Sequence, residues 1–217
     1  EVEKFHETLS RTGISPVISH GSYLVNLASP DPLLYRKSLK SMVEEIERCH
    51  LLRIPSVVIH PGFHRGRGER EGLRRVSEAI NVILDETEEL SVKIILETTA
   101  GQGTSLGDRF EHFAVLFDRI EDVHRLGLCV DTCHIFAAGY DLRDRRAYER
   151  MVKSVQDSVG LSKLSLFHLN DSLRDMGSRV DRHVHIGDGY IGLQAFRFIM
   201  RDERFTRVPK IIETPKG

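Results

Sequence analysis

Histidine and carboxylate side chains recur through this chain, each at or soon after the end of a short apolar run. Imidazole and carboxylate together are typical ligands of Zn²⁺, Mn²⁺ or Fe²⁺, whereas Mg²⁺ and Ca²⁺ prefer shells made only of oxygen. Without a cation, so many converging groups would repel one another and shift their pKa values at a free-energy cost. The pattern therefore predicts a metal cluster. The candidate ligands are His20, His60, Glu97, Asp131, His134, His168, Asp181, His183 and Glu213.

The number of candidate ligands indicates more than one ion. The nine side chains exceed the shell of one tetrahedral ion, which takes about four ligands. Two or three ions that share a bridging carboxylate fit this number better. Because clustered metals activate a water molecule and stabilise both the attacking and the leaving oxygen in phosphoryl transfer, the predicted chemistry is hydrolysis.

The elements that must bring these residues together are short runs rich in Val, Ile and Leu. These runs are apolar on both faces, which is typical of parallel strands covered by helices. Between them, apolar residues at three- and four-residue spacing predict helices, the first of which begins at the N-cap and first-turn proline Asp31-Pro32. The expected strands are 16–23, 56–60, 93–98, 127–131, 164–169 and 210–213.

A series of parallel β/α units forms either an open doubly wound sheet or a closed barrel. In the open sheet only the strands beside a switch point direct their ends at one site, whereas in a barrel all strand ends converge on one mouth. Ligand-type residues at every expected strand end favour the barrel. Because no linker or break in composition divides the chain, we expect residues 1–217 to form a single α/β domain of the (β/α)8 TIM-barrel type. Two of the eight strands are missing from the expected set: either they precede Glu1 in a longer parent chain, or this is a shortened variant of the barrel.

Composition narrows the setting of the protein. Acidic residues (32) nearly balance basic ones (31), so no overall positive field indicates a nucleic acid, although local arrangement matters more than the sum. Three cysteines suit a reducing compartment, and Cys129 and Cys133 lie in an apolar run where structural thiols are common. No apolar stretch approaches the roughly 20 residues that span a bilayer. We therefore expect an intracellular protein without a membrane partner.

Seven motifs, in order along essentially the whole chain, resemble those of the endonuclease IV family. The members of this family are apurinic/apyrimidinic endonucleases that have a TIM barrel and a trinuclear zinc site. The resemblance implies a (β/α)8 TIM barrel that lacks its first two β/α units in this chain. The matching motifs are HGSYLVNLASP (20–30), HPG (60–62), LETTAGQGT (96–104), CVDTCHIFAAGYD (129–141), FHLNDS (167–172), DRHVHIGDG (181–189) and ETP (213–215).

The resemblance implies three overlapping zinc shells, with Glu97 as the bridging carboxylate and Mn²⁺ as an alternative ion at one site. His185 matches no ligand of the family, and we expect it to be solvated or to lie behind the ligands. In chain order the implied shells are His20, His60 and Glu97; Glu97, Asp131, His168 and Glu213; and His134, Asp181 and His183.

The resemblance also implies a reaction in base excision repair. The phosphodiester 5′ to an abasic site in duplex DNA would be hydrolysed, leaving a 3′-hydroxyl and a 5′-deoxyribose phosphate. Glu97 would be catalytic as well as a ligand, because it would orient the attacking nucleophile. Tyr23 and Leu24 match the family position that enters the minor groove as a wedge; alternatively, both are core residues at a strand end. We expect a monomer in a bacterial cytoplasm, a nucleus or a mitochondrion.

Two other functions remain open from the sequence. A sugar isomerase or epimerase on a similar barrel would use Glu97, Asp131, His168 and Glu213 around one Mn²⁺ or Mg²⁺, which leaves the other candidate ligands without a shared purpose. A lesion-binding protein that keeps the cluster but does not cleave is the second alternative. The number of bound metal ions distinguishes the first, and binding without nicking distinguishes the second.

Overall fold

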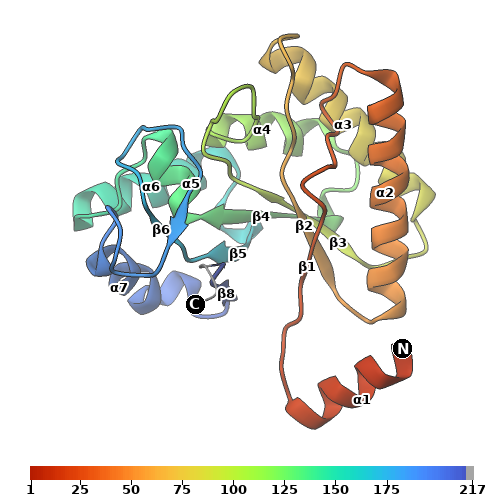
Figure 1. The fold of residues 1–217 in the computed structure, drawn as a ribbon, viewed down its shortest axis with the longest axis horizontal. Helices are drawn as coiled ribbons and strands as arrows, with labels where there is room; N and C mark the ends of the chain where they lie inside the picture. The colour runs from red at the N-terminus through yellow and green to blue at the C-terminus, as the bar shows by residue number, and fades with distance from the viewer. Residues whose placement is uncertain (214–217) are drawn as a thin grey trace.

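The computed structural model describes residues 1–213, so Thr214 and Pro215 of the ETP motif lie outside the described part of the chain. The main feature is a six-stranded sheet whose strands are all parallel and, apart from two short strands outside it, follow chain order (Figure 1). The strands are β1 (Ser19–His20), β2 (Ser56–Ile59), β3 (Lys93–Glu97), β4 (Leu126–Asp131), β5 (Leu164–His168) and β8 (Lys210–Ile211). All six expected strands are therefore confirmed, with shorter bounds at several ends.

The two faces of the sheet bury different clusters of side chains. In β2, Val57 and Ile59 belong to the large core beneath the helices, whereas Val58 points to a smaller cluster on the other face. Ile95 and Leu166 are buried in that second cluster. Because successive side chains of a strand point to opposite faces, burial of both faces requires the continuous apolar runs seen in the sequence.

Helices cover the face of the sheet that carries the large core, and helices adjacent along the sheet pack against each other (Figure 1). Apolar residues at helical spacing face inward as predicted, with Met42, Ile46, Val76 and Ile80 fully buried. Asp31 caps the first helix of this layer, because its side chain accepts from two backbone N–H groups. These helices are α2 (Pro32–Leu51), α3 (Glu69–Glu86), α4 (Phe110–Arg119), α6 (Arg145–Ser158) and α7 (Leu193–Arg201).

Several elements differ from the expectation. β1 is shorter than 16–23 because the chain leaves the sheet after His20 and exposes Tyr23 and Leu24. The unpredicted helix α5 (Thr132–Ala138) begins directly after β4, since the side chain of Asp131 accepts from the His134 N–H and caps the helix. The other unpredicted elements are α1 (Val2–Thr12), the antiparallel pair β6 (Asp171–Ser172) and β7 (His183–Val184), and the 3₁₀ turns Val123–Arg125, Leu161–Lys163 and Glu203–Phe205.

A membrane-spanning helix is absent from the described residues, since none of their helices combines the length and the apolar character that crossing requires.

A buried carboxylate joins the outer helices at the end of α7. Asp202 accepts a hydrogen bond of 2.7 Å from the Tyr148 hydroxyl and others from Arg204. Burial opposes its ionisation, but the hydrogen bonds from Arg204 and Tyr148 outweigh burial and lower the pKa of Asp202 to about 2. This pKa lies below the value of about 3.9 for an unfolded Asp. The resulting stabilisation is therefore complete above the unfolded pKa and is lost as pH falls through the folded one.

We predict that Asp202→Asn lowers the free energy of unfolding by about 1–3 kcal/mol at pH 7. The difference from the wild type should shrink as pH falls from about 5 towards 2, because the unfolded carboxyl takes up its proton first. Urea denaturation across this pH range measures it. Asp157→Asn, which removes an exposed carboxylate paired with Lys153, is the control and should change little. A deficit that stays constant with pH would contradict the prediction.

Candidate metal centre

The predicted ligands converge at the edge of the sheet where its parallel strands end. The register of the strands brings them to this edge. Asp131 of β4 pairs with His168 of β5, and Glu97 lies at the end of β3, the neighbour of β4 on its other side. Strand ends supply His20, Glu97, Asp131 and His168; residues just after strands supply His60 and Glu213; and α5, β7 and the loop before β7 supply His134, His183 and Asp181. All nine predicted side chains thus lie in one cluster.

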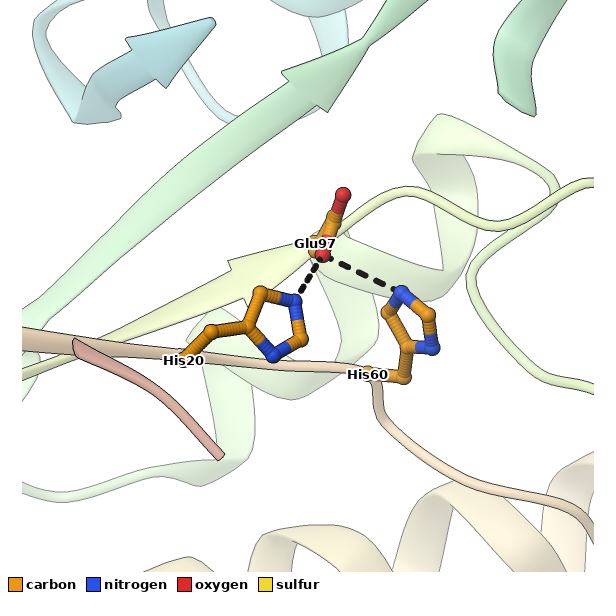
Figure 2. Close-up of side chains that lie close together, drawn as sticks. All are labelled: His20, His60 and Glu97. Carbon is orange, nitrogen blue, oxygen red and sulfur yellow. Dashed lines mark hydrogen bonds and ion pairs between the residues drawn. The ribbon is translucent and has the colours of Figure 1, made fainter. Parts of the chain in front are cut away.

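Glu97 is the centre of the cluster. The Nε2 atoms of His20 and His60 lie 3.0 and 3.1 Å from its Oε2 atom, and Figure 2 shows both rings directed at that oxygen. Its other oxygen, Oε1, lies 2.7 Å from Nδ1 of His168. One buried carboxylate therefore faces two separate sets of imidazoles, as a bridge between two cations would.

Asn170 organises the neighbouring part of the cluster and was not predicted. Its Nδ2 atom donates to Oδ2 of Asp131 at 2.5 Å and to Oε2 of Glu213 at 3.4 Å, while its Oδ1 accepts from the Glu213 N–H at 2.7 Å. Glu213 in turn lies 3.0 Å from His168. The position of Asn170 two residues after a strand-end histidine, in FHLNDS, is the only sequence signal that pointed to it.

Asp181 joins two further histidines. Its Oδ2 lies 3.1 Å from Nε2 of His134, and its Oδ1 lies 3.3 Å from Nε2 of His183. Both Nε2 atoms are buried, yet neither has a hydrogen-bond partner among the described residues. Asp131 completes this group from the floor of the site, with its ligand oxygen close to both rings.

Backbone carbonyls determine which ring nitrogen carries the proton. Nδ1 of His134 lies 2.8 Å from the Thr98 carbonyl, and Nδ1 of His20 lies 2.8 Å from the Gly21 carbonyl. Because a carbonyl only accepts, Nδ1 carries a proton in both rings. Nε2 then either carries a second proton or leaves its lone pair opposite a carboxylate oxygen. A lone pair opposite a carboxylate is repulsive unless a cation lies between them. This second contact through Nδ1 is typical of metal-ligating histidines, so the donor set fits metal ions.

The buried carboxylates of the cluster also require compensating positive charge. Burial opposes ionisation of Glu97, but hydrogen bonds from His168, His20 and His60 hold its pKa well below the ordinary value. Burial raises the pKa of Asp131. For His134, burial favours the neutral ring, yet the nearby carboxylates outweigh it and raise the pKa to about 10. Protons on the histidines therefore neutralise the buried carboxylates when no cation does, and metal ions would compete with them.

The centre has a closed floor and an open rim. Glu97 and Asp131 are completely buried, whereas the side chains of His20 and Asp181 are 37% and 42% exposed. A cleft of about 280 Å³ opens beside His60, His134 and Asp181 and is also lined by Gln102 and Arg182. The rim therefore offers a substrate access to the centre. Tyr23 and Leu24 are 87% and 68% exposed, which excludes the alternative that both are core residues.

Two other expectations concern residues near the cluster. His185 is exposed and belongs to none of the ligand groups among the described residues. Cys129 and Cys133 are buried free thiols, and burial raises the pKa of Cys133 to about 12. Their sulfurs lie near ligands of the centre, and in the absence of a cation burial raises the pKa of both thiols and keeps them protonated at neutral pH. The prediction that both cysteines have structural roles therefore stays a prediction.

Comparison with known proteins identifies the family. Residues 1–217 match the family described as xylose isomerase-like TIM barrel. Probable endonuclease 4 of Chloroflexus aggregans is 55% identical over the whole chain, which covers 76% of that protein. The crystal structure of endonuclease IV from Thermus thermophilus superimposes with a TM-score of 0.86 at 35% identity, covering all of this chain and 75% of that one. The chain belongs to the endonuclease IV family.

The match to endonuclease IV confirms the TIM-barrel class of the fold and the family that the seven motifs indicated. The fold is shared more widely. A D-tagatose 3-epimerase-like protein superimposes with a TM-score of 0.77 at 20% identity, covering 99% of this chain and 76% of that one. Likeness at this identity concerns the fold alone, so the residues at the strand ends must decide the activity.

We predict that Asn170→Ala weakens metal binding by about 10–100-fold, because loss of a residue that orients ligands has this effect at other metal sites. Titration with a metal-competing chelator at pH 7.5 measures the affinity. Asn81→Ala is the control, since the Asn81 amide also joins two segments, here through two hydrogen bonds to backbone groups that link α3 to the end of α4. Equal affinities for Asn170→Ala and the wild type would contradict the role assigned to Asn170.

Proposed function

We propose that this protein is an apurinic/apyrimidinic endonuclease that hydrolyses the phosphodiester 5′ to an abasic site in duplex DNA. The products would be a 3′-hydroxyl and a 5′-deoxyribose phosphate. The observation that carries the proposal is the convergence of nine imidazole and carboxylate groups, several with Nε2 directed at a carboxylate oxygen, in a chain of the endonuclease IV family. The protein would act on DNA as a monomer.

Three zinc ions would occupy the centre, with Mn²⁺ as an alternative at one position. When bound, such ions supply an activated water molecule and stabilise charge on the attacking and leaving oxygens. The first group of ligands would be His20, His60 and Glu97, and the second would be Glu97, Asp131, His168 and Glu213. The third would be His134, Asp181 and His183. The first two sets correspond to groups whose ligand atoms lie within 4.8 Å of one another.

The residues of the chain would position and shield the reacting groups. Glu97 is rigid, because three histidines hold its two oxygens from different sides, and it would orient the nucleophile for attack in line with the leaving oxygen. The buried floor would exclude water behind the reacting phosphate, which strengthens every electrostatic contact there. Arg182, which lines the adjoining cleft, would bind a backbone phosphate.

Tyr23 and Leu24 would recognise the lesion. They are the exposed tip of the segment that leaves β1, and they line a hollow of about 500 Å³ together with Phe63 and Arg65. An exposed aromatic and an exposed aliphatic side chain on the rim of a metal centre suit insertion into a kinked minor groove. An abasic nucleotide lacks a stacked base, so extruding it requires less free energy than extruding an intact one.

A single-metal sugar isomerase or epimerase is the competing function. Glu97, Asp131, His168 and Glu213 do lie within reach of one ion, and the fold resembles that of an epimerase-like protein. That function leaves the convergence of His134 and His183 on Asp181 without a purpose. The nuclease uses all nine residues.

The metal content distinguishes the two functions. We predict about three equivalents of transition metal per chain after dialysis, because three ligand groups are available at about three or four ligands each. Elemental analysis of the purified protein measures it. Asp181→Ala should lose about one equivalent and keep the others. One equivalent in the wild type, unchanged in the Asp181 variant, would favour the epimerase.

Activity on a defined duplex tests the reaction itself. We predict that the protein nicks a duplex with one tetrahydrofuran site on its 5′ side, that a chelator abolishes nicking, and that Zn²⁺ restores it. Glu97→Gln should reduce the rate by at least about a hundredfold, since even residues behind metal ligands cost 10–100-fold when removed. Denaturing electrophoresis locates the cut. Binding of the duplex without any nick would instead support a lesion-binding protein.

A further inference from the structure

The two exposed residues proposed to enter DNA sit on irregular backbone. Tyr23 and Leu24 form a turn between β1 and α2, and neither strand nor helix holds it. A wedge on a mobile loop would lose conformational entropy on insertion and would bind weakly. Some contact must therefore order this segment before DNA arrives.

Leu27 and Ala28 anchor the following residues in the core, and the side chain of Asn26 supplies the polar contact nearest to the turn. It lies two residues after Leu24, is 4% exposed, and forms a pair of hydrogen bonds with the backbone of Phe63. Its Nδ2 donates to the Phe63 carbonyl at 3.0 Å, and its Oδ1 accepts from the Phe63 N–H at 2.8 Å. Oδ1 also accepts from the Ala28 N–H at 3.1 Å, which closes the turn behind it. One amide side chain thus replaces the backbone pairing of a strand.

Gly62 makes room for this amide. A Cβ atom at Gly62 would lie 2.4 Å from Oδ1 of Asn26, and the backbone there has a φ of +112°. Both features require glycine. The HPG segment after β2 therefore has a backbone shape that receives the side chain of Asn26 closely.

The segment that Asn26 holds is itself part of the metal centre. Phe63 lies three residues after His60 and forms an isolated bridge with Ser105, and the Leu106 N–H donates to the Gly62 carbonyl at 2.8 Å. The Leu106 carbonyl then accepts a hydrogen bond from the hydroxyl of Thr99, and Thr99 lies two residues after Glu97. Hydrogen bonds therefore run without a break from the exposed turn to the loops after β2 and β3.

We propose that Asn26 is a positioning residue that fixes the Tyr23–Leu24 turn relative to the metal centre and so couples lesion recognition to the site of cleavage. This inference rests on the proposed nuclease function. Because Asn26 contacts no predicted metal ligand among its hydrogen-bond partners, its loss should impair the binding of the lesion much more than the chemical step.

The competing explanation is that Asn26 merely stabilises the fold. Asn81 provides the matched control, since its Nδ2 donates to the Arg119 carbonyl at 3.3 Å and its Oδ1 accepts from the Glu121 N–H at 3.0 Å. It links two backbone segments in the same way but lies on the outer helices. A purely structural role predicts that both variants lose stability and that neither changes the KM of the folded protein.

The experiment compares these two variants, loaded with Zn²⁺, on a duplex with one tetrahydrofuran site. Asn26→Ala should raise KM at least about tenfold with kcat within about threefold of the wild type, whereas Asn81→Ala should change neither. Metal content should stay at the wild-type value in both. Hydrogen exchange should become faster in residues 22–28 and 60–64 of Asn26→Ala alone.

A mutant cycle with the double variant Tyr23→Ala/Leu24→Ala tests whether Asn26 acts through the wedge. If it does, adding Asn26→Ala to this double variant should raise KM less than about threefold further, because the wedge is already lost. Independent, multiplying effects would overturn the proposal, as would a normal KM in Asn26→Ala.

If Asn26→Ala does not fold, Asn26→Asp keeps the side-chain size and both accepted hydrogen bonds, and it should raise KM because a carboxylate oxygen then faces the Phe63 carbonyl.

Failure of the proposed function looks different. If the wild-type chain does not nick the duplex, the nuclease assignment fails, and the role of Asn26 in lesion binding fails with it. If the wild type nicks and Asn26→Ala matches it in KM and in hydrogen exchange, only the inference about Asn26 is wrong.

Discussion

The structure depends on a carboxylate buried where parallel strands end. Glu97 has no exposed surface, yet its pKa stays well below the ordinary value because histidines surround both of its oxygens. An unpaired charge in such a position would be strongly destabilising, so neighbouring elements must bring compensating groups to it. The ends of β1, β2 and β5 therefore all carry residues directed at one point. The geometry of the sheet and the electrostatics of the site impose the same requirement.

Hydrogen bonds that join neighbouring loops transmit this order to the rim. The Thr98 carbonyl sets the tautomer of His134, Asn170 joins Asp131 to Glu213, and Asn26 joins the exposed turn to the HPG loop. Each of these contacts links two segments that follow different strands. They act beside apolar packing, since Leu27 and Leu106 of the same loops are fully buried in the core. The rim is thus held by a few amide and carbonyl groups above an apolar sheet.

The same scaffold supports other chemistry, which explains why the fold by itself does not decide the activity. An epimerase-like protein shares the arrangement of strands and helices at 20% identity, and four of the residues here lie within reach of a single ion. What distinguishes this chain is the second layer of donors around that group, from His20 and His60 on one side and from Asp181 with its two histidines on the other. The function is carried by these additions at the strand ends.

The sequence by itself determined the strands, most helices and all nine candidate ligands, because apolar periodicity and residue type are local properties. It did not indicate α5, since a strand that ends in its own helix cap leaves no loop to mark the boundary. Asn26 and Asn170 were also hidden, because an amide shows its role only through partners 37 and 43 residues away. Only the tertiary structure decided which nitrogen of each histidine faces a carboxylate. It also decided that Tyr23 and Leu24 are exposed, since both depend on segments that the fold brings together.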